Sequence, residues 1–308
     1  MVEVKGLTRY YGNFTALEDV AFDIAEGEIV GLLGLNGAGK STTLKILAGI
    51  LAPSSGTVTI QGIDVREQPE LLRSRIGYLP EDTPLYVDMT VTSFLRHAGR
   101  LKGMSAAQIE ARLPEVVRLA DLEGREGQVI GTLSHGYKKR VGIAQAIIHD
   151  PRLVILDEPI SGLDPAQIVE MRAVVRGLAT GRAVILSSHI LGEISQTCDR
   201  MVVINGGRMV AQGTEAELHD GSAHKLVVTV RGDADRLLTW LGEHERVTAV
   251  RRAESGDGLA AALVVLDSDA REQLVAELVR DGFGIRLVED PEDELEEIFL
   301  ALTKQEDA

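Results

Sequence analysis

The chain has 308 residues, of which 44% are hydrophobic and 26% charged, which is ordinary for a globular protein with a sizeable core. Its formal net charge is −15, and because a duplex-binding surface needs a basic excess, we expect no nucleic-acid partner. The single cysteine, Cys198, excludes an intrachain disulfide and is expected to be a small buried hydrophobe. No apolar run reaches the roughly 18 residues that span a bilayer, and the N-terminus has no signal-peptide stretch. We therefore expect a soluble, cytoplasmic chain.

The first two thirds of the chain alternate short apolar strands with helical patterns, which is typical of an α/β fold. "VEVKGL" and "LEDVAFDIAEGE" alternate apolar and polar residues, which predicts an antiparallel flap. Apolar residues at three-to-four spacing then predict a helical insertion from Thr90 to about Ala146, with Ser105 capping its second helix. The apolar runs that predict buried parallel strands are 28–34, 75–80, 152–157 and 183–188.

The pattern changes after residue 222. Residues 223–308 follow a β-α-β-β-α-β order, which predicts a small ferredoxin-like α+β domain, and a last helix is expected over 293–303. This part holds 20 acidic against 10 basic residues, which we interpret as solvated surface. The predicted domains are therefore 1–222, with a helical subdomain over about 82–146, and 223–308.

A phosphate-binding loop is predicted at "GLNGAGKS", which fits G-x-x-x-x-G-K-[ST], follows an apolar strand and opens a helical run. Its glycines let backbone N–H groups turn toward phosphate oxygens. Lys40 would reach the β- and γ-phosphates, the Ser41 hydroxyl would bind Mg²⁺ and Thr42 would touch the α-phosphate. The residues expected at the nucleotide phosphates are Gly34, Leu35, Asn36, Gly37, Ala38, Gly39, Lys40, Ser41 and Thr42.

Polar residues that follow two later strands complete a hydrolytic site. In "LVILDEP", Asp157 ends a buried strand and suits Mg²⁺, whereas Glu158 lies one step further and suits a general base for water. His189 follows "AVILSS", at the strand end where ligands gather in such sheets, and would hydrogen-bond the γ-phosphate. A second anion site is predicted at "LSHGY", where Ser134 caps a helix and Gly136 exposes backbone N–H groups.

Seven motifs in one order resemble the ATP-binding cassette (ABC) ATPases over residues 1 to about 215. The loop matches Walker A, "LVILDEP" matches Walker B, "LSHGY" matches the signature and "SGLD", which ends at Asp164, matches the D-loop. Tyr11 matches the aromatic that stacks on adenine, Glu81 falls at the Q-loop glutamine and His189 matches the switch histidine. The resemblance implies a P-loop NTPase cassette with an antiparallel β flap and a helical insertion. It also implies that the cassette binds ATP together with Mg²⁺, and that Ser41, Glu81 and Asp157 hold the Mg²⁺.

The resemblance also explains the second anion site. In this family two cassettes pack head to tail, so Ser134 and the Gly136 N–H would hold the γ-phosphate bound by the other copy, in a homodimer or a paired cassette. A helix N-terminus gains more from a phosphate on a facing surface than from one already enclosed by its own loop. "IGYLPEDTPLYVDMTV" further resembles cassettes of bacterial multi-subunit exporters of the gliding-motility branch, which serve separate permease subunits at the cytoplasmic face of the inner membrane.

The sequence departs from the family pattern at a few positions. Glu81 replaces the usual glutamine and adds negative charge near the phosphates, so we expect altered metal affinity without loss of hydrolysis. The other departures are Leu35 for proline, His135 and Tyr137 in the signature, and Ile160 for threonine. Two further functions stay open at this point: a soluble ABC ATPase that remodels a macromolecular complex, and an inactive regulatory cassette.

Overall fold

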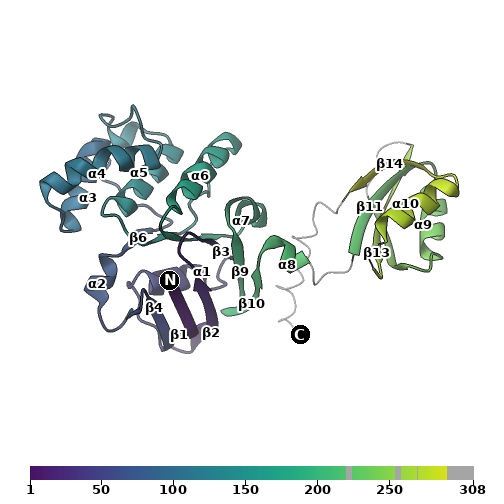
Figure 1. The fold of residues 1–308 in the computed structure, drawn as a ribbon, viewed down its shortest axis with the longest axis horizontal. Helices are drawn as coiled ribbons and strands as arrows, with labels where there is room; N and C mark the ends of the chain where they lie inside the picture. The colour runs from purple at the N-terminus through teal and green to yellow at the C-terminus, as the bar shows by residue number, and fades with distance from the viewer. Residues whose placement is uncertain (220–223, 254–257, 269, 290–308) are drawn as a thin grey trace. The chain divides into compact units, whose positions relative to one another are not determined.

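The computed structural model describes residues 1–219, 224–253, 258–268 and 270–289. The chain divides into two compact units, Met1–Glu215 and Ala216–Ala308 (Figure 1). No helix within the described ranges combines the length and the hydropathy needed to cross a membrane.

The predicted flap is a four-stranded antiparallel sheet in the order β2-β1-β4-β5. In β1, Val2 and Val4 are buried while Glu3 and Lys5 are exposed, because only one face of the sheet lies on the core. The flap strands are β1 (Val2–Tyr11), β2 (Phe14–Ile24), β4 (Ser55–Ile60) and β5 (Ile63–Asp64).

The central sheet has six strands in the order β10-β9-β3-β8-β7-β6. Every pair is parallel except β10 with β9. The four predicted buried strands are confirmed to within one residue at each end, and every residue of β3, β7 and β8 is buried, as expected for strands covered on both faces. The strands are β3 (Ile29–Leu33), β6 (Ile76–Leu79), β7 (Leu153–Leu156), β8 (Ala183–Ser188), β9 (Arg200–Asn205) and β10 (Arg208–Gly213).

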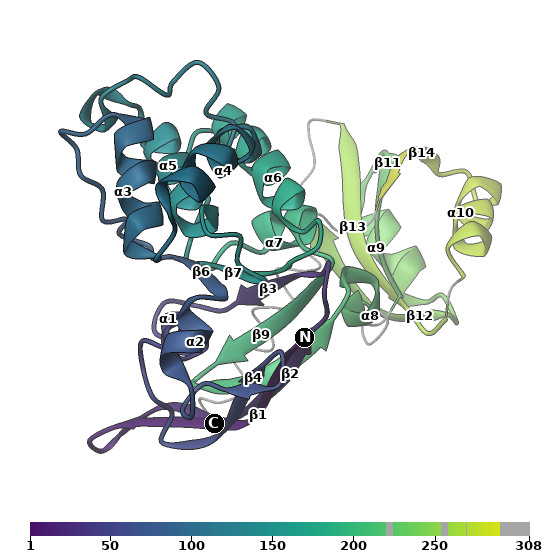
Figure 2. The same ribbon diagram turned by 60° about the vertical axis from the view of Figure 1, so that its left-hand side comes forward.

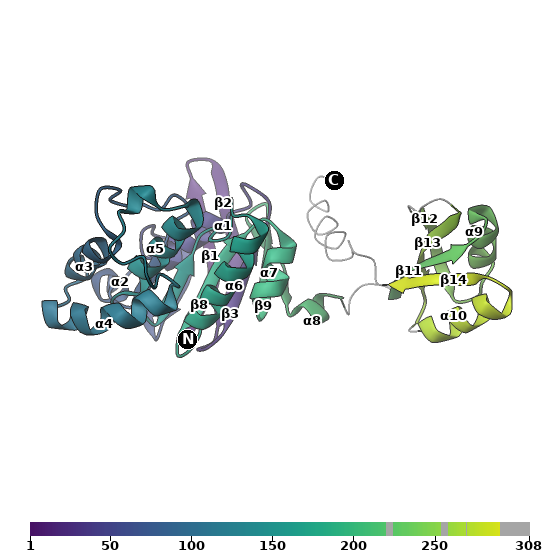
Figure 3. The same cartoon turned by 90° about the horizontal axis from the view of Figure 1, so that it is seen from above.

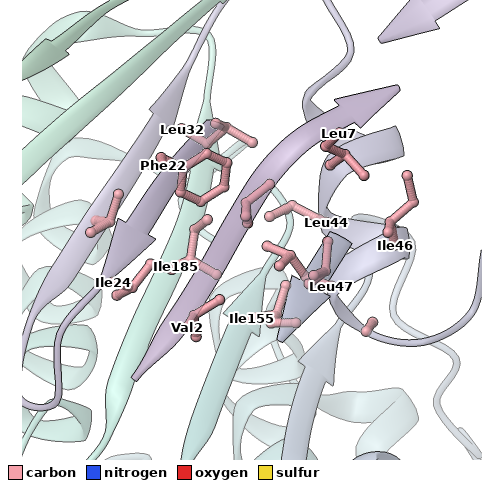
Figure 4. Close-up of a cluster of buried hydrophobic side chains, with 14 of the residues drawn as sticks. Val2, Leu7, Phe22, Ile24, Leu32, Leu44, Ile46, Leu47, Ile155 and Ile185 are labelled. Carbon is pink, nitrogen blue, oxygen red and sulfur yellow. The ribbon is translucent and has the colours of Figure 1, made fainter. Parts of the chain in front are cut away.

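One face of the central sheet packs against α1 (Lys40–Leu47) and the flap. Figure 4 shows this core, in which Leu44 and Leu47 of α1 meet Ile155 of β7 and Ile185 of β8, with Phe22 of the flap beside them. Each such fully buried aliphatic side chain contributes roughly 1.5–3 kcal/mol to the free energy of unfolding. This packing fixes the start of α1 at the carboxyl end of β3.

The opposite face is covered by helices, as Figure 1 shows for α5 (His135–Ile147), α6 (Pro165–Leu178) and α7 (Leu191–Thr197). The contact with α7 is so close that a Cβ at Gly31 of β3 would lie 2.9 Å from the Cys198 Sγ. Cys198 is of intermediate exposure rather than fully buried as predicted, and the desolvation of its side chain raises the pKa of the thiol.

The helical insertion is confirmed and groups α3, α4 and α5 beside the central sheet (Figure 2). Ser105 caps α4, as the sequence predicts. The structure adds that Gln108 closes a capping box with Ser105 and that Thr90 caps α3. The short helix α2 (Pro69–Arg73) precedes the insertion. The elements of the insertion are α3 (Val91–Leu101), α4 (Ala106–Leu119), a 3₁₀ turn (Ile130–Thr132) and α5 (His135–Ile147).

The second unit has the predicted β-α-β-β-α-β order (Figure 3). Its four strands form an antiparallel sheet in the order β12-β13-β11-β14, which is the ferredoxin-like arrangement. The helix predicted over 293–303 lies outside the described residues. The elements, after α8 (Glu215–His219), are β11 (His224–Arg231), α9 (Ala234–Gly242), β12 (Val247–Ala253), β13 (Leu259–Leu266), α10 (Arg271–Arg280) and β14 (Gly284–Glu289).

Candidate nucleotide-binding site

The predicted phosphate-binding loop joins β3 to α1. Gly39 is the N-cap of α1 at φ +111°, and a Cβ there would lie 2.7 Å from Leu17 Cδ2 and 2.9 Å from the Ala16 carbonyl oxygen. Only glycine combines this backbone conformation with this close approach, so the loop is shaped by the strand that lies over it. The loop leads directly into the N-terminus of α1, which is where a phosphate is most favourable.

Lys40 lies buried across the loop. Its Nζ donates to the carbonyl oxygens of Gly34 at 2.7 Å and Leu35 at 3.3 Å. Burial lowers the pKa of Lys40, and the neighbouring carboxylate of Glu158 opposes that shift. The ammonium group is therefore held inside the loop by backbone oxygens and one carboxylate, which a triphosphate can replace.

Of the three residues predicted to bind a metal ion, Ser41 and Asp157 lie within hydrogen-bond distance of each other. The Asp157 Oδ1 accepts a hydrogen bond from Ser187 Oγ at 2.7 Å and one from Ser41 Oγ at 3.3 Å. Glu81 lines the same cavity as Ser41. Among the described residues no three His, Cys, Asp or Glu side chains form a metal cluster. A metal ion here would therefore take most of its ligands from phosphate and water, which suits Mg²⁺.

Glu158, the predicted general base, is buried and held by three elements. Its N–H donates to Ser187 Oγ at 2.9 Å, and its carbonyl oxygen accepts from Lys139 Nζ at 2.7 Å. Its carboxylate lies 3.1 Å from His189 Nδ1 and 3.7 Å from Lys40 Nζ. The three predicted catalytic residues thus meet, although they come from α1 and from the ends of β7 and β8.

A cavity of about 600 Å³ contains most of the predicted site. At one end, the guanidinium of Arg9 lies 4.8 Å from the centroid of the Tyr11 ring and covers one face of it. The other face suits a stacked base. The predicted residues that line the cavity are Tyr11, Leu35, Asn36, Gly37, Gly39, Lys40, Ser41, Thr42, Glu81, Glu158 and His189. The lining residues that the sequence reasoning missed are Phe14, Ala16 and Ser161.

Phe14 was missed because the predicted strand began at Leu17, whereas β2 begins at Phe14, which pairs directly with Tyr11. Two predicted residues of the loop do not line the cavity. Gly34 gives its carbonyl oxygen to Lys40, and Ala38 is buried beneath the loop.

Ser134, Gly136 and Asp164 also lie outside the lining of this cavity. Ser134 caps α5 as predicted, by accepting from the Tyr137 N–H, and is exposed. Asp164 caps α6 and accepts from the Gln167 N–H at 2.9 Å. A Cβ at Gly136 would lie 2.4 Å from Gln167 Oε1, so the starts of α5 and α6 are packed together.

Known proteins share this arrangement. The family model described as ABC transporter matches residues 17–161. The chain is 34% identical over 301 residues to an uncharacterised ABC transporter ATP-binding protein of Bacillus subtilis (strain 168), covering 97% of this chain and 98% of that relative. The chain belongs to the ABC transporter ATP-binding protein family.

The ABC cassette also resembles the Nod factor export ATP-binding protein I of Rhizobium meliloti (strain 1021), at 35% identity over 99% of this chain and 88% of that protein. Among solved structures, a dimeric post-hydrolysis ABC cassette bound to ADP and Pi matches with a TM-score of 0.62 and 25% identity, over 70% of this chain and 98% of that one. The protein is the ATP-binding subunit of an ABC transporter and an ABC-type ATPase, as the sequence predicts, and remodelling of a soluble complex is not favoured.

Proposed function

We propose that two copies of this chain, or this chain and a paired cassette, close head to tail around two molecules of Mg²⁺-ATP and so drive a separate membrane permease. The observation that carries this proposal is the start of the 13-residue helix α5, where Ser134 is exposed, although Gly136 is buried against Gln167 rather than exposed as the sequence predicts. Ser134 and Gly136 lie at a helix N-terminus, which favours phosphate binding. They do not line the cavity at the phosphate-binding loop of the same chain. A second copy facing the opposite way would bring a triphosphate to them.

Each residue of the site then has a role. Lys40, the loop N–H groups and Thr42 bind the phosphates, and Tyr11 stacks on the adenine. Ser41, Asp157 and Glu81 would hold Mg²⁺, which supplies positive charge to the β- and γ-phosphate oxygens. Asp164, which fixes the start of α6, helps to form the closed interface.

Glu158 acts as the general base. It takes a proton from a water molecule, the water oxygen bonds to the γ-phosphorus, and the bond from that phosphorus to the bridging oxygen breaks, leaving ADP and phosphate. Its carboxylate faces Lys40. A triphosphate that binds Lys40 frees this carboxylate for water, while His189 and Lys40 stabilise the charge that develops on the γ-phosphate.

An apolar groove of about 500 Å³ in the helical subdomain suits the permease. It is lined by Pro84, Leu85 and Tyr86 together with Phe94 and other residues of α3. The first residue of this lining, Pro84, follows Glu81 of the nucleotide cavity by three positions. A movement of Glu81 on nucleotide binding would therefore be carried to the groove through a short segment of chain. We propose export as the direction, supported by the similarity to the Nod factor export ATP-binding protein I of Rhizobium meliloti. We also propose a peripheral place on the cytoplasmic face of the inner membrane.

Size-exclusion chromatography of Glu158→Gln tests the closed dimer. With ATP and Mg²⁺ this variant should elute as a dimer, and adding Ser134→Arg should return it to the monomer position, because the new side chain blocks the phosphate. A Glu158→Gln protein that stays monomeric at saturating ATP would contradict the proposal.

We also propose that the cassette ends at residue 222 and that 223–308 is an accessory domain. Removing 223–308 and measuring ATP hydrolysis and membrane recruitment separately tests this division. Hydrolysis should persist, and a loss of hydrolysis in a folded truncated chain would contradict it.

A further inference from the structure

The backbone of Glu158 is in an unfavourable conformation. Its φ is +49°, in the left-handed region that residues other than glycine rarely adopt. Such a conformation is unfavourable by itself and persists only where the surroundings hold it in place. The groups that hold it are therefore part of what aims the base at its water.

One of these groups comes from the signature helix. Lys139 of α5 is 5% exposed, and its Nζ donates to the Glu158 carbonyl oxygen at 2.7 Å. A second donor to the same oxygen, the Ser161 N–H, is longer at 3.4 Å. Burial lowers the pKa of Lys139, and the carboxylates of Glu81 and Glu158 oppose that shift.

A purely structural role explains this lysine poorly. Burying an ammonium group costs several kcal/mol, whereas a methionine would fill similar space without that cost. The ammonium group of Lys139 donates to the backbone carbonyl oxygen of Glu158. It also lines a small cavity of about 290 Å³ together with Glu81 and Asp82. Both neighbours are acidic, so the lysine also offsets the charge that Glu81 brings to the nucleotide.

We propose that Lys139 is a positioning residue that transmits engagement of the signature helix to the general base of the same chain. This inference rests on the proposed head-to-tail dimer. In that dimer Ser134 touches the nucleotide of one site, while Glu158 of the same chain acts in the other. Lys139 lies five positions after Ser134 along α5, a rise of about 7.5 Å. The helix therefore links the two sites through the hydrogen bond from Lys139 Nζ to the Glu158 carbonyl oxygen.

The decisive variant is Lys139→Met, which removes the charge and the donor and keeps the length. Its kcat should fall about 10- to 100-fold, as expected for losing a charge-assisted hydrogen bond, while the Kd for ATP changes less than about threefold. Lys139→Arg keeps a charged donor and should recover part of kcat. Lys5→Met, at an exposed lysine of β1 that pairs with Glu3, is the control and should keep kcat within about twofold.

A double-mutant cycle tests the link between the sites. If Lys139 carries the effect of the signature contact, Ser134→Ala should lower kcat much less in the Lys139→Met background than in the wild type. Additive losses, or a Lys139→Met protein with wild-type kcat, would overturn the proposal. If Lys139→Met has a lower melting temperature than wild type, the same cycle with Lys139→Gln provides the measurement.

Failure of this inference is distinguishable from failure of the proposed function. Size-exclusion chromatography of Glu158→Gln with ATP reports the dimer while Lys139 is intact. A dimer that forms, combined with additive losses, rejects the role of Lys139 alone.

Discussion

Replacing Glu158 by glutamine should separate nucleotide affinity from chemistry. The Glu158 carboxylate lies 3.7 Å from Lys40 Nζ, and both side chains are buried. At an effective dielectric constant of about 20, this pair is worth roughly 4.5 kcal/mol of Coulomb energy before desolvation is subtracted. Desolvation cancels much of that energy, so we expect ATP to bind Glu158→Gln about tenfold more tightly, or ~1.4 kcal/mol.

The same change should slow hydrolysis by at least about 100-fold, because an amide cannot accept the proton from water. Equilibrium binding of a fluorescent ATP analogue gives the affinity, and single-turnover hydrolysis gives the chemical step. Glu110→Gln is the matched control, since Glu110 pairs with Arg96 on an exposed helix surface. Weaker ATP binding by Glu158→Gln would refute the electrostatic reasoning, and undiminished hydrolysis would refute the assignment of the base.

Three further changes test other parts of the site and fold. Glu81→Gln should leave kcat within roughly tenfold, about 1.4 kcal/mol of barrier, and a complete loss in a steady-state assay would contradict this. Gly39→Ala should abolish ATP binding, because its Cβ meets buried Leu17, whereas Gly37→Ala, with φ +85° but open space, should weaken binding by at most about tenfold in the same titration. Burial lowers the pKa of His149 to about 4, so the unfolded chain takes up a proton below about pH 6.5 before the folded one does. Stability is therefore lost as pH falls from 6.5 toward 4, by about 2 kcal/mol between pH 7 and 5, and urea unfolding of His149→Gln should show a smaller loss.

The sequence predicted the strands well because burial on both faces leaves a simple signal. β8 was placed at its observed bounds, and Asp157, Glu158 and His189 were expected at strand ends, where they lie. The order of strands was not predicted, since β3 lies between β8 and β9, which come more than a hundred residues later. No local pattern encodes which distant strand becomes a neighbour.

The residues of the site that the sequence analysis missed belong to no motif; they hydrogen-bond to motif residues from distant parts of the chain. Ser187 binds both Asp157 and Glu158, and Lys139 binds the Glu158 carbonyl oxygen, across separations of 19 to 30 residues. Ser187 could have been found from the sequence. Ser187 and Ser188 end β8, and successive side chains of a strand point to opposite faces of the sheet, so the two hydroxyls face different sides at the strand end. Lys139 was not, because a lysine after a helix start is more often exposed than buried.

The most direct test of the shared nucleotide is the structure of Glu158→Gln with ATP and Mg²⁺, by crystallography or cryo-electron microscopy. The account predicts that Ser134 Oγ and the Gly136 N–H of one copy lie within hydrogen-bond distance of the γ-phosphate that Lys40 of the other copy binds. Finding both groups far from every triphosphate would contradict the central claim, although the fold would stand.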